Sequence, residues 1–184
     1  MLEAFLLAGY VLVLSPLLYL LKIEPIWIFV GMLIISLPGI YAMVTGAPFV
    51  PTSKKVLRKM MTLAKLTKGQ KVYDLGCGDG RLIFAASKEG ANAVGYELSF
   101  PTYVLAKIKS LFFPGSKIQY KNFWTQDYKD ADVIFCFLLK DTMQKFYKIV
   151  WPQLRPGCKV VSHAFKIDGL KPSDKIDSAV LYIK

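Results

Sequence analysis

The chain has 184 residues, of which 54% are hydrophobic, and its formal net charge is +11 at pH 7. This length holds one catalytic domain of ordinary size with a short appendage, and it leaves little room for a second core. The three cysteines, Cys77, Cys136 and Cys158, form no CxxC pair. We therefore expect reduced thiols, and the sequence indicates neither a disulfide framework nor a metal site.

Two apolar segments open the chain. Glu3 is the only charged residue in the segment 2–21, and the segment 26–44 has none. Each segment has about the 20 residues that a helix needs to cross a bilayer. The start of the chain lacks the positive charges of a secretory signal. Residues 1–45 are therefore predicted to form a membrane anchor of two transmembrane helices.

Basic residues gather directly after these segments. Lys54, Lys55, Arg58 and Lys59 follow the second segment closely, and loops rich in Lys and Arg stay on the cytoplasmic side of a membrane. The sequence therefore predicts a catalytic domain on the cytoplasmic face. Its positive charge attracts anionic lipid, nucleic acid or an acidic protein, and the neighbouring apolar segments favour membrane lipid over nucleic acid as a partner.

Residues 46–68 are predicted to contain a linker and a basic amphipathic helix. Two prolines in the stretch 46–53 favour an extended linker, and Ser53 is a candidate N-cap. Over residues 54–66, apolar side chains recur at helical spacing while lysines and an arginine occupy the other face. We expect this helix to pack on the domain with its basic side near the membrane.

Residues 69–184 are predicted to form one α/β domain. Five short apolar stretches have the length and composition of strands: 71–75, 92–97, 117–120, 132–137 and 159–164. Three longer stretches between them have helical periodicity: 81–88, 100–111 and 142–154. This alternation predicts a Rossmann-like, mostly parallel sheet with crossover helices. Only one further strand, 178–183, is expected after the fifth, so the C-terminal end is predicted to be short.

A glycine-rich loop follows the first predicted strand. The sequence Asp74-Leu-Gly-Cys-Gly-Asp-Gly80 leads directly into the first predicted helix of the domain. Glycines at 76, 78 and 80 let a ligand approach the backbone closely. Glu97 ends the next strand about 20 residues later, where a carboxylate accepts hydrogen bonds from ribose hydroxyls. The arrangement predicts a nucleotide site that includes the loop residues Cys77 and Asp79.

A dinucleotide site is the nearest alternative for this loop. The fingerprint G-x-G-x-x-G requires a third glycine where this chain has Arg81, whose side chain would crowd the helix N-terminus. Asp74 and Asp79 would repel a pyrophosphate, whereas they suit the amino group and the sulfonium of S-adenosylmethionine. The loop charge therefore favours S-adenosyl-L-methionine as the cofactor.

These motifs resemble those of a known enzyme class. Asp74-Leu-Gly-Cys-Gly-Asp-Gly80 resembles the first motif of the seven-strand, class I methyltransferases, and Gly95-Tyr-Glu-Leu98 resembles their acidic second-strand motif. The resemblance implies the class I methyltransferase fold, here with a shortened C-terminal end and preceded by the transmembrane helices.

A closer likeness runs from about residue 48 to residue 165 and includes Pro48-Phe-Val-Pro-Thr52 and Lys121-Asn-Phe-Trp124. These stretches are similar to the membrane-attached protein-lysine methyltransferases that act on the adenine nucleotide translocase and the ATP synthase c subunit. The resemblance implies a lysine of a membrane protein as the acceptor, with Pro51 and Thr52 closing over the donor. The chain departs from the family pattern at Cys77, where Ser is usual, and at Asn122, where Asp is usual.

Asn122, Phe123 and Trp124 follow the third predicted strand, at the edge of the sheet where an adenine ring is expected. An amide can bond the edge of the ring and an aromatic side chain can cover it. Phe123 and Trp124 are equally consistent with core packing. His163, in the fifth predicted strand, is expected to be a hydrogen-bonded core residue and not a general base.

The predicted reaction is methyl transfer to a neutral lysine amine held in line with the donor, without a covalent intermediate. Asp74, Gly76, Gly78 and Glu97 would hold the donor, and no catalytic residue facing the lysine is assigned. Two alternatives stay open. The acceptor could be a small molecule or a lipid headgroup, or the chain could be a membrane-tethered nucleotide-binding module without turnover.

Overall fold

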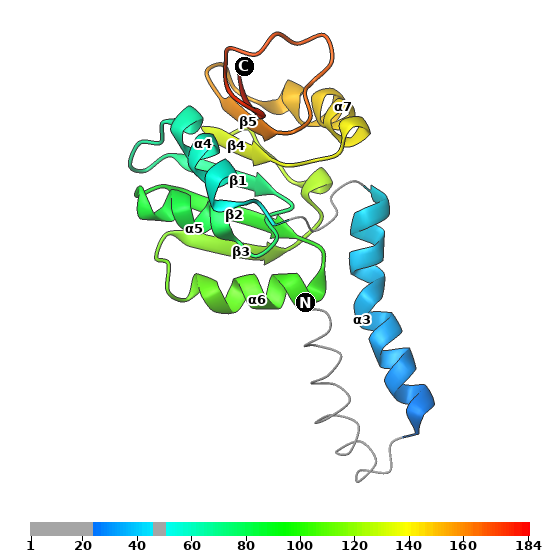
Figure 1. Ribbon diagram of the computed structural model, residues 1–184. Coiled ribbons are helices and arrows are strands. Elements are labelled where there is room, and N and C mark those ends of the chain that lie inside the picture. The colour runs from blue at the N-terminus through cyan, green and yellow to red at the C-terminus, as the bar shows by residue number, and fades with distance from the viewer. Residues whose placement is uncertain (1–23, 46–50) are drawn as a thin grey trace. The chain divides into compact units, whose positions relative to one another are not determined.

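The computed structural model describes residues 24–45 and 51–184 (Figure 1). The chain divides into two compact units, Met1–Leu37 and Pro38–Lys184. Helix α3 (Pro25–Thr45) coincides with the second predicted apolar segment, and the first segment lies outside the described residues. In the part of the chain that the structure describes, no helix is found that is both long and apolar enough to cross a membrane.

Helix α4 (Lys54–Ala64) is the predicted amphipathic helix. The Ser53 hydroxyl accepts a hydrogen bond from the Val56 backbone N–H at 3.3 Å, which confirms Ser53 as the N-cap. The helix ends where Lys65 adopts a left-handed conformation with φ of 44°. Met60, Leu63 and Ala64 are fully buried against the sheet, whereas Lys54, Lys55 and Arg58 are exposed. Packing of the apolar face therefore fixes this helix to the domain.

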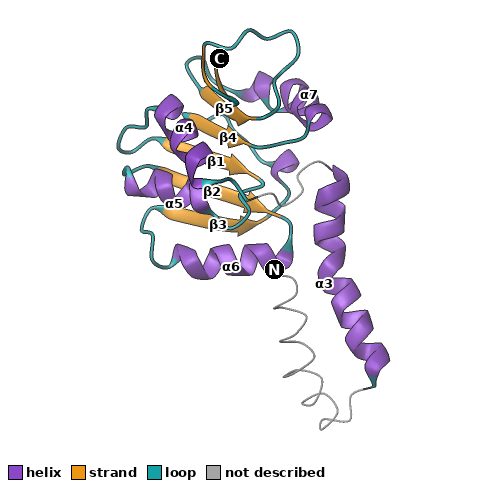
Figure 2. Cartoon of the chain, viewed as in Figure 1, coloured by secondary structure: helices purple, strands orange, loops and turns teal. Residues whose placement is uncertain are grey.

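A seven-stranded sheet forms the centre of the second unit, in the order β3-β2-β1-β4-β5-β7-β6 (Figure 2). Its strands are β1 (Lys71–Leu75), β2 (Asn92–Glu97), β3 (Ser116–Tyr120), β4 (Val133–Cys136), β5 (Lys159–His163), β6 (Asp174–Ile176) and β7 (Ala179–Ile183). The first five strands pair in parallel. The predicted parallel sheet is confirmed, with strand bounds within two residues of those expected.

Helices cover both faces of this sheet. One face carries α4, α5 (Arg81–Lys88) and α6 (Phe100–Ser110), and the other carries α7 (Lys140–Ile149) with the short 3₁₀ helices η2 (Phe123–Thr125) and η3 (Trp151–Gln153). Alternate strand residues serve the two faces, so Val133 packs under the first layer and Ile134 under the second. The predicted helix 142–154 gives way to η3 because Pro152 cannot donate the next helical hydrogen bond.

The C-terminal end differs from the sequence-based expectation. We expected one strand after β5, whereas the structure has the hairpin β6–β7, with β7 antiparallel to both β5 and β6. The short β6 contains Asp174 and Lys175, so it lacks the apolar pattern that reveals a strand. Asp177 turns the hairpin with φ of 52° and pairs with Lys59 of α4. The predicted short C-terminal end is therefore wrong, because the chain closes the sheet with an antiparallel hairpin beyond β5.

An aromatic cluster covers the face of β1 and β2, where the connection from β3 to β4 contains only the short 3₁₀ helix η2 and no α-helix. The rings of Tyr73 and Tyr96 stack with centroids 6.0 Å apart, and Tyr128 meets Tyr73 edge to face at 5.3 Å. Tyr128 is fully buried, and its hydroxyl donates a hydrogen bond of 2.5 Å to the Phe123 carbonyl. The cluster therefore fixes the segment after β3 without an α-helix.

Replacing Tyr128→Phe removes the shorter of the two hydrogen bonds that the Phe123 carbonyl accepts, the other coming from the Gln126 N–H at 3.4 Å. We expect the free energy of unfolding to fall by about 1 kcal/mol, because a buried hydrogen bond is lost. Tyr120→Phe is the matched control, since Tyr120 is 41% exposed and its ring contacts do not involve the hydroxyl. Urea denaturation measures both variants, and an equal effect of the two substitutions would contradict the role given to Tyr128.

Candidate active site

The glycine loop lies at the carboxyl end of β1 and is tied to β2. The backbone N–H groups of Gly76 and Cys77 both donate to the Tyr96 carbonyl, at 3.1 and 2.9 Å. Gly76 and Gly78 have φ of 81° and 55°, a region that residues with a Cβ rarely adopt. The loop therefore turns sharply out of the strand at its carboxyl end before α5 begins.

Cys77 fills the space between the loop and β2. A Cβ at Gly95 would lie 2.6 Å from the Cys77 sulfur, so the absent side chain of Gly95 makes room for the thiol. Cys77 is 5% exposed, and burial raises its pKa well above the usual thiol value. Its side chain therefore packs as a small apolar group.

Three backbone N–H groups converge on the Glu97 carboxylate at the end of β2. Gly78 donates to one oxygen at 2.9 Å, while Leu98 and Ser99 donate to the other at 2.9 and 2.7 Å. Burial raises the Glu97 pKa, and these three bonds act in the opposite direction. Glu97, the residue predicted to bind the ribose, is thus held between the glycine loop and the start of α6.

Asp74 is the most deeply buried carboxylate of the site. It is 4% exposed, and burial raises its pKa to about 8, with a further contribution from the nearby carboxylates of Glu97 and Asp79. Neighbouring carboxylates and burial disfavour the ionised form of Asp74, and a cationic ligand would stabilise that form. The site therefore fits a positively charged donor such as S-adenosylmethionine better than a pyrophosphate.

Asp79 forms ion pairs with basic side chains of the chain itself. Arg81 donates two hydrogen bonds of 2.8 Å to the Asp79 carboxylate, and Lys109 lies 3.5 Å from it. Arg81 also donates to the Thr52 carbonyl, so the pair links the linker before α4 to the loop. Hydrogen bonding from Arg81 lowers the Asp79 pKa. Among the described residues, Asp74 and Glu97 are the site carboxylates without an ion pair.

This bridging role of Arg81 was not predicted from the sequence, where Arg81 served only as an argument against a dinucleotide site. The spacing of Asp79 and Arg81 at the start of a helix was the available signal for a bidentate pair. The bridge places the two predicted linker residues near the loop. Thr52 is 8% exposed and Pro51 is exposed. Their contact with the donor stays a prediction.

The structure gathers the predicted adenine-binding residues at η2, after β3. The Asn122 side chain accepts the Trp124 N–H at 3.0 Å and thereby caps η2. Phe123 is 6% exposed and belongs to the core, whereas Trp124 is half-buried beneath Lys145, whose ammonium lies 4.5 Å from the ring centroid. Trp124 is therefore the more accessible of the two aromatic candidates.

His163 ends β5 and only partly matches its expected core role. It is half-buried and meets the Phe137 ring at 4.7 Å, but its buried Nδ1 has no hydrogen-bond partner among the described residues. Burial lowers its pKa, which favours the neutral imidazole. The hydrogen bonding expected of this histidine therefore does not involve Nδ1.

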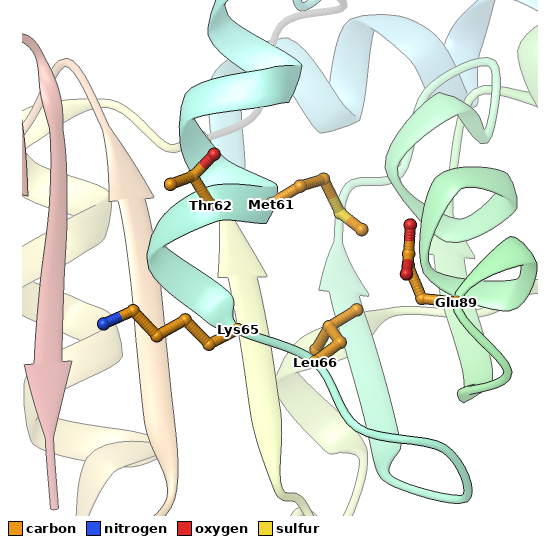
Figure 3. A pocket seen from close by; sticks show the side chains of 5 residues that line it. All are labelled: Met61, Thr62, Lys65, Leu66 and Glu89. Carbon is orange, nitrogen blue, oxygen red and sulfur yellow. The ribbon is translucent and has the colours of Figure 1, made fainter.

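A pocket of about 310 Å³ lies away from the glycine loop (Figure 3). It is lined by Met61, Thr62, Lys65, Leu66 and Glu89. These residues come from the ends of α4 and α5, whereas the glycine loop precedes the start of α5. The pocket is therefore separate from the candidate site. Its Glu89 is a carboxylate outside the candidate site and can serve as a control.

Comparison with known families supports the same chemistry. Residues 74–174 match a family model described as the ANTKMT methyltransferase domain. A protein-lysine N-methyltransferase of Saccharolobus islandicus is 38% identical over 138 residues, which are 72% of this chain and 86% of that protein. The mouse lysine N-methyltransferase of the ATP synthase c subunit is 30% identical over 122 residues, 64% of this chain, and the chain spans about half of its length (49%).

A solved structure shares this fold and carries the product of the donor. The crystal structure of an RNA methyltransferase from Salinibacter ruber in complex with S-adenosyl-L-homocysteine has a TM-score of 0.66 and 31% identity. The similarity covers 73% of this chain and 92% of that one. Together with the acidic site, this likeness identifies S-adenosylmethionine as the cofactor.

Glu97→Ala should weaken donor binding. The substitution removes the carboxylate predicted to accept the ribose hydroxyls, at a cost of about 2 kcal/mol, or roughly thirtyfold in affinity. Glu89→Ala is the matched control, since it removes an exposed carboxylate at the separate pocket. Titration calorimetry with S-adenosylmethionine gives both affinities. An unchanged affinity in Glu97→Ala would contradict the assignment.

Stability of the donor-free protein should depend on the protonation of Asp74. Its pKa is about 8 in the fold and roughly 4 in the unfolded chain, so between these values the folded state keeps a proton that the unfolded state has released. The free energy of unfolding should therefore fall as pH rises through this window. Asp74→Asn removes the titrating group and should lose less stability between pH 6 and pH 8. Urea denaturation at both pH values tests this, and equal losses would argue against a raised pKa.

Proposed function

This chain belongs to the ANTKMT methyltransferase domain family and uses S-adenosylmethionine, and from this premise we propose that it methylates the side-chain amine of a lysine in a protein at a membrane. The observation that carries the proposal is the acidic, glycine-lined site at the ends of β1 and β2 in a chain whose relatives include protein-lysine methyltransferases. The acceptor class and the membrane location rest on separate parts of the chain.

The end of β4 supports a lysine acceptor. Enzymes that methylate exocyclic amines or amides resemble one another in an Asn/Asp-Pro-Pro-Tyr sequence at this point, whereas this chain has Phe135-Cys-Phe-Leu-Leu139. Phe135, Cys136 and Leu138 are fully buried, so this end of the strand is apolar. A lysine amine needs no amide-binding cradle once it has lost its proton, and an apolar surrounding lowers the pKa of an amine.

The membrane location is supported by the N-terminal composition. Helix α3 has no charged residue, and several of its large apolar side chains are exposed, among them Trp27 at 67% and Ile34 at 60%. Such side chains need an apolar partner, and the basic residues of α4 follow within about ten positions.

Different residues of the chain have different roles in the proposed methyl transfer. S-adenosylmethionine, when bound, supplies a methyl group activated by its sulfonium. Asp74 and Glu97 would hold the cationic donor, and the loop backbone at Gly76 and Gly78 would allow its close approach. The amine attacks after it has lost its proton, so that a carbon–nitrogen bond forms as the carbon–sulfur bond breaks. Fixed alignment and exclusion of water would supply most of the acceleration.

Two other acceptors remain part of the test. A lipid headgroup would be served by the same membrane location, and RNA would be favoured by the likeness to the Salinibacter ruber enzyme together with the basic surface. Each acceptor leaves the labelled methyl group in a different chemical fraction, so one experiment separates the three.

The full chain is incubated with labelled S-adenosylmethionine and membranes from source cells that lack the gene. We expect the label in a protein band, with mass spectrometry placing it on a lysine. Glu97→Ala should reduce this labelling and Glu89→Ala should not. Label found only in the lipid extract or only in RNA would show that a lipid or RNA, and not a lysine, is the acceptor. No transfer to any fraction would contradict the proposal.

A further inference from the structure

We propose that the outward face of α6 and the turn that follows it form a docking surface for an anionic lipid bilayer. The surface consists of Leu105, Ile108, Leu111 and Phe112, with lysines beside them. The inference rests on the membrane location proposed above, but it concerns a part of the catalytic domain that the N-terminal segments do not include. Figure 1 shows α6 along the β3 edge of the sheet.

Helix α6 has apolar side chains both on its inner face, toward the sheet, and on its outer face. Ala106 is fully buried against the sheet, as the inner face requires. Leu105 and Ile108, one turn apart on the opposite face, are 48% and 56% exposed. Leu111 and Phe112 continue this face and are 77% and 78% exposed. Large apolar side chains that gather on one face of a monomer mark an interaction site.

Contacts with the rest of the domain hold the turn after α6 in place. Phe112 is therefore exposed in an ordered turn. Its neighbour Phe113 stacks on Phe84 of α5 with ring centroids 4.5 Å apart, and the Lys88 ammonium lies 5.2 Å from the Phe113 ring. The Phe112 N–H donates to the Lys109 carbonyl at 3.0 Å. One phenylalanine therefore anchors the turn in the core, while the other points to solvent.

Charge identifies the partner as an anionic surface. No Asp or Glu occurs between Glu97 and Asp127, whereas this stretch contains four lysines: Lys107, Lys109, Lys117 and Lys121. On a helical projection, Lys107 and Lys109 flank the apolar face on its two sides. Lys107, Lys117 and Lys121 are exposed, and Lys109 lies 3.5 Å from Asp79.

An apolar face between lysines is the pattern of helices that lie in a membrane interface. Their apolar side chains enter the acyl boundary, while the lysine ammonium groups stay at the headgroups. Protein–protein interfaces, in contrast, are depleted in lysine relative to the rest of the surface. The observations therefore favour a lipid bilayer over a protein partner.

The test places an environment-sensitive fluorophore on the full chain at position 111 through Leu111→Cys, which keeps Phe112 in place. The three native cysteines are buried, so the label is directed to the new thiol. Ser173→Cys is the matched control, because Ser173 is exposed and precedes β6 at the opposite edge of the sheet. Each labelled protein is mixed with phosphatidylcholine vesicles with and without phosphatidylglycerol, and binding is followed by sedimentation.

We expect a blue shift and quenching by lipid-attached nitroxides at position 111 with the anionic vesicles only, and neither change at position 173. Phe112→Ser in the labelled protein should reduce the shift. Lys107→Gln should also reduce the docked fraction, since a lysine near an anionic surface contributes a factor of roughly five in affinity. These substitutions leave the donor site unchanged.

Other outcomes would overturn the proposal in distinguishable ways. Sedimentation with vesicles while position 111 stays in water would reject this surface and leave the membrane location standing. Absence of sedimentation would reject both. Equal shifts at the two positions would indicate non-specific adsorption, and equal shifts in neutral and anionic vesicles would reject the role of the lysines. A shift that grows with protein concentration without vesicles would identify a second copy of the chain as the partner.

Discussion

Three backbone N–H groups, from Gly78, Leu98 and Ser99, meet on the buried carboxylate of Glu97, and the candidate site depends on this convergence. A buried charge is costly unless it is hydrogen-bonded, and these donors come from the glycine loop and from the approach to α6. The carboxylate therefore holds two separate segments in register at the edge of the sheet. A ribose that binds here would compete with, or share, bonds that already stabilise the loop.

The remaining acids of the site have different environments and hence different roles. Asp79 is neutralised by Arg81, which also reaches the Thr52 carbonyl and so connects the linker to the donor loop. Asp74 has no such partner, and burial raises its pKa to about 8. A cationic donor would supply the missing positive charge. The preference for a sulfonium therefore rests on Asp74 and Glu97, whereas Asp79 maintains the arrangement of the backbone.

The β3 edge of the domain is built differently from the opposite edge. At β3, α6 packs its small Ala106 inward and presents Leu105, Ile108 and Phe112 outward. At the other edge, β6 carries charged residues and pairs only with β7, and Asp177 of the hairpin turn is tied to α4 by Lys59. One edge of the sheet is therefore closed by a polar hairpin, while the other has an apolar helix face beside lysines.

Local sequence determined the five parallel strands, the helices between them and the glycine loop, because each of these depends on nearby residues: apolar runs of strand length, helical periodicity, and glycines at Gly76 and Gly78 where φ is positive. The Ser53 cap was predictable for the same reason. Only the tertiary structure decided the Arg81 bridge to Thr52, the packing of Cys77 against Gly95 and the hairpin strand β6. These features depend on contacts between segments far apart in the chain, and no local pattern of hydropathy records them.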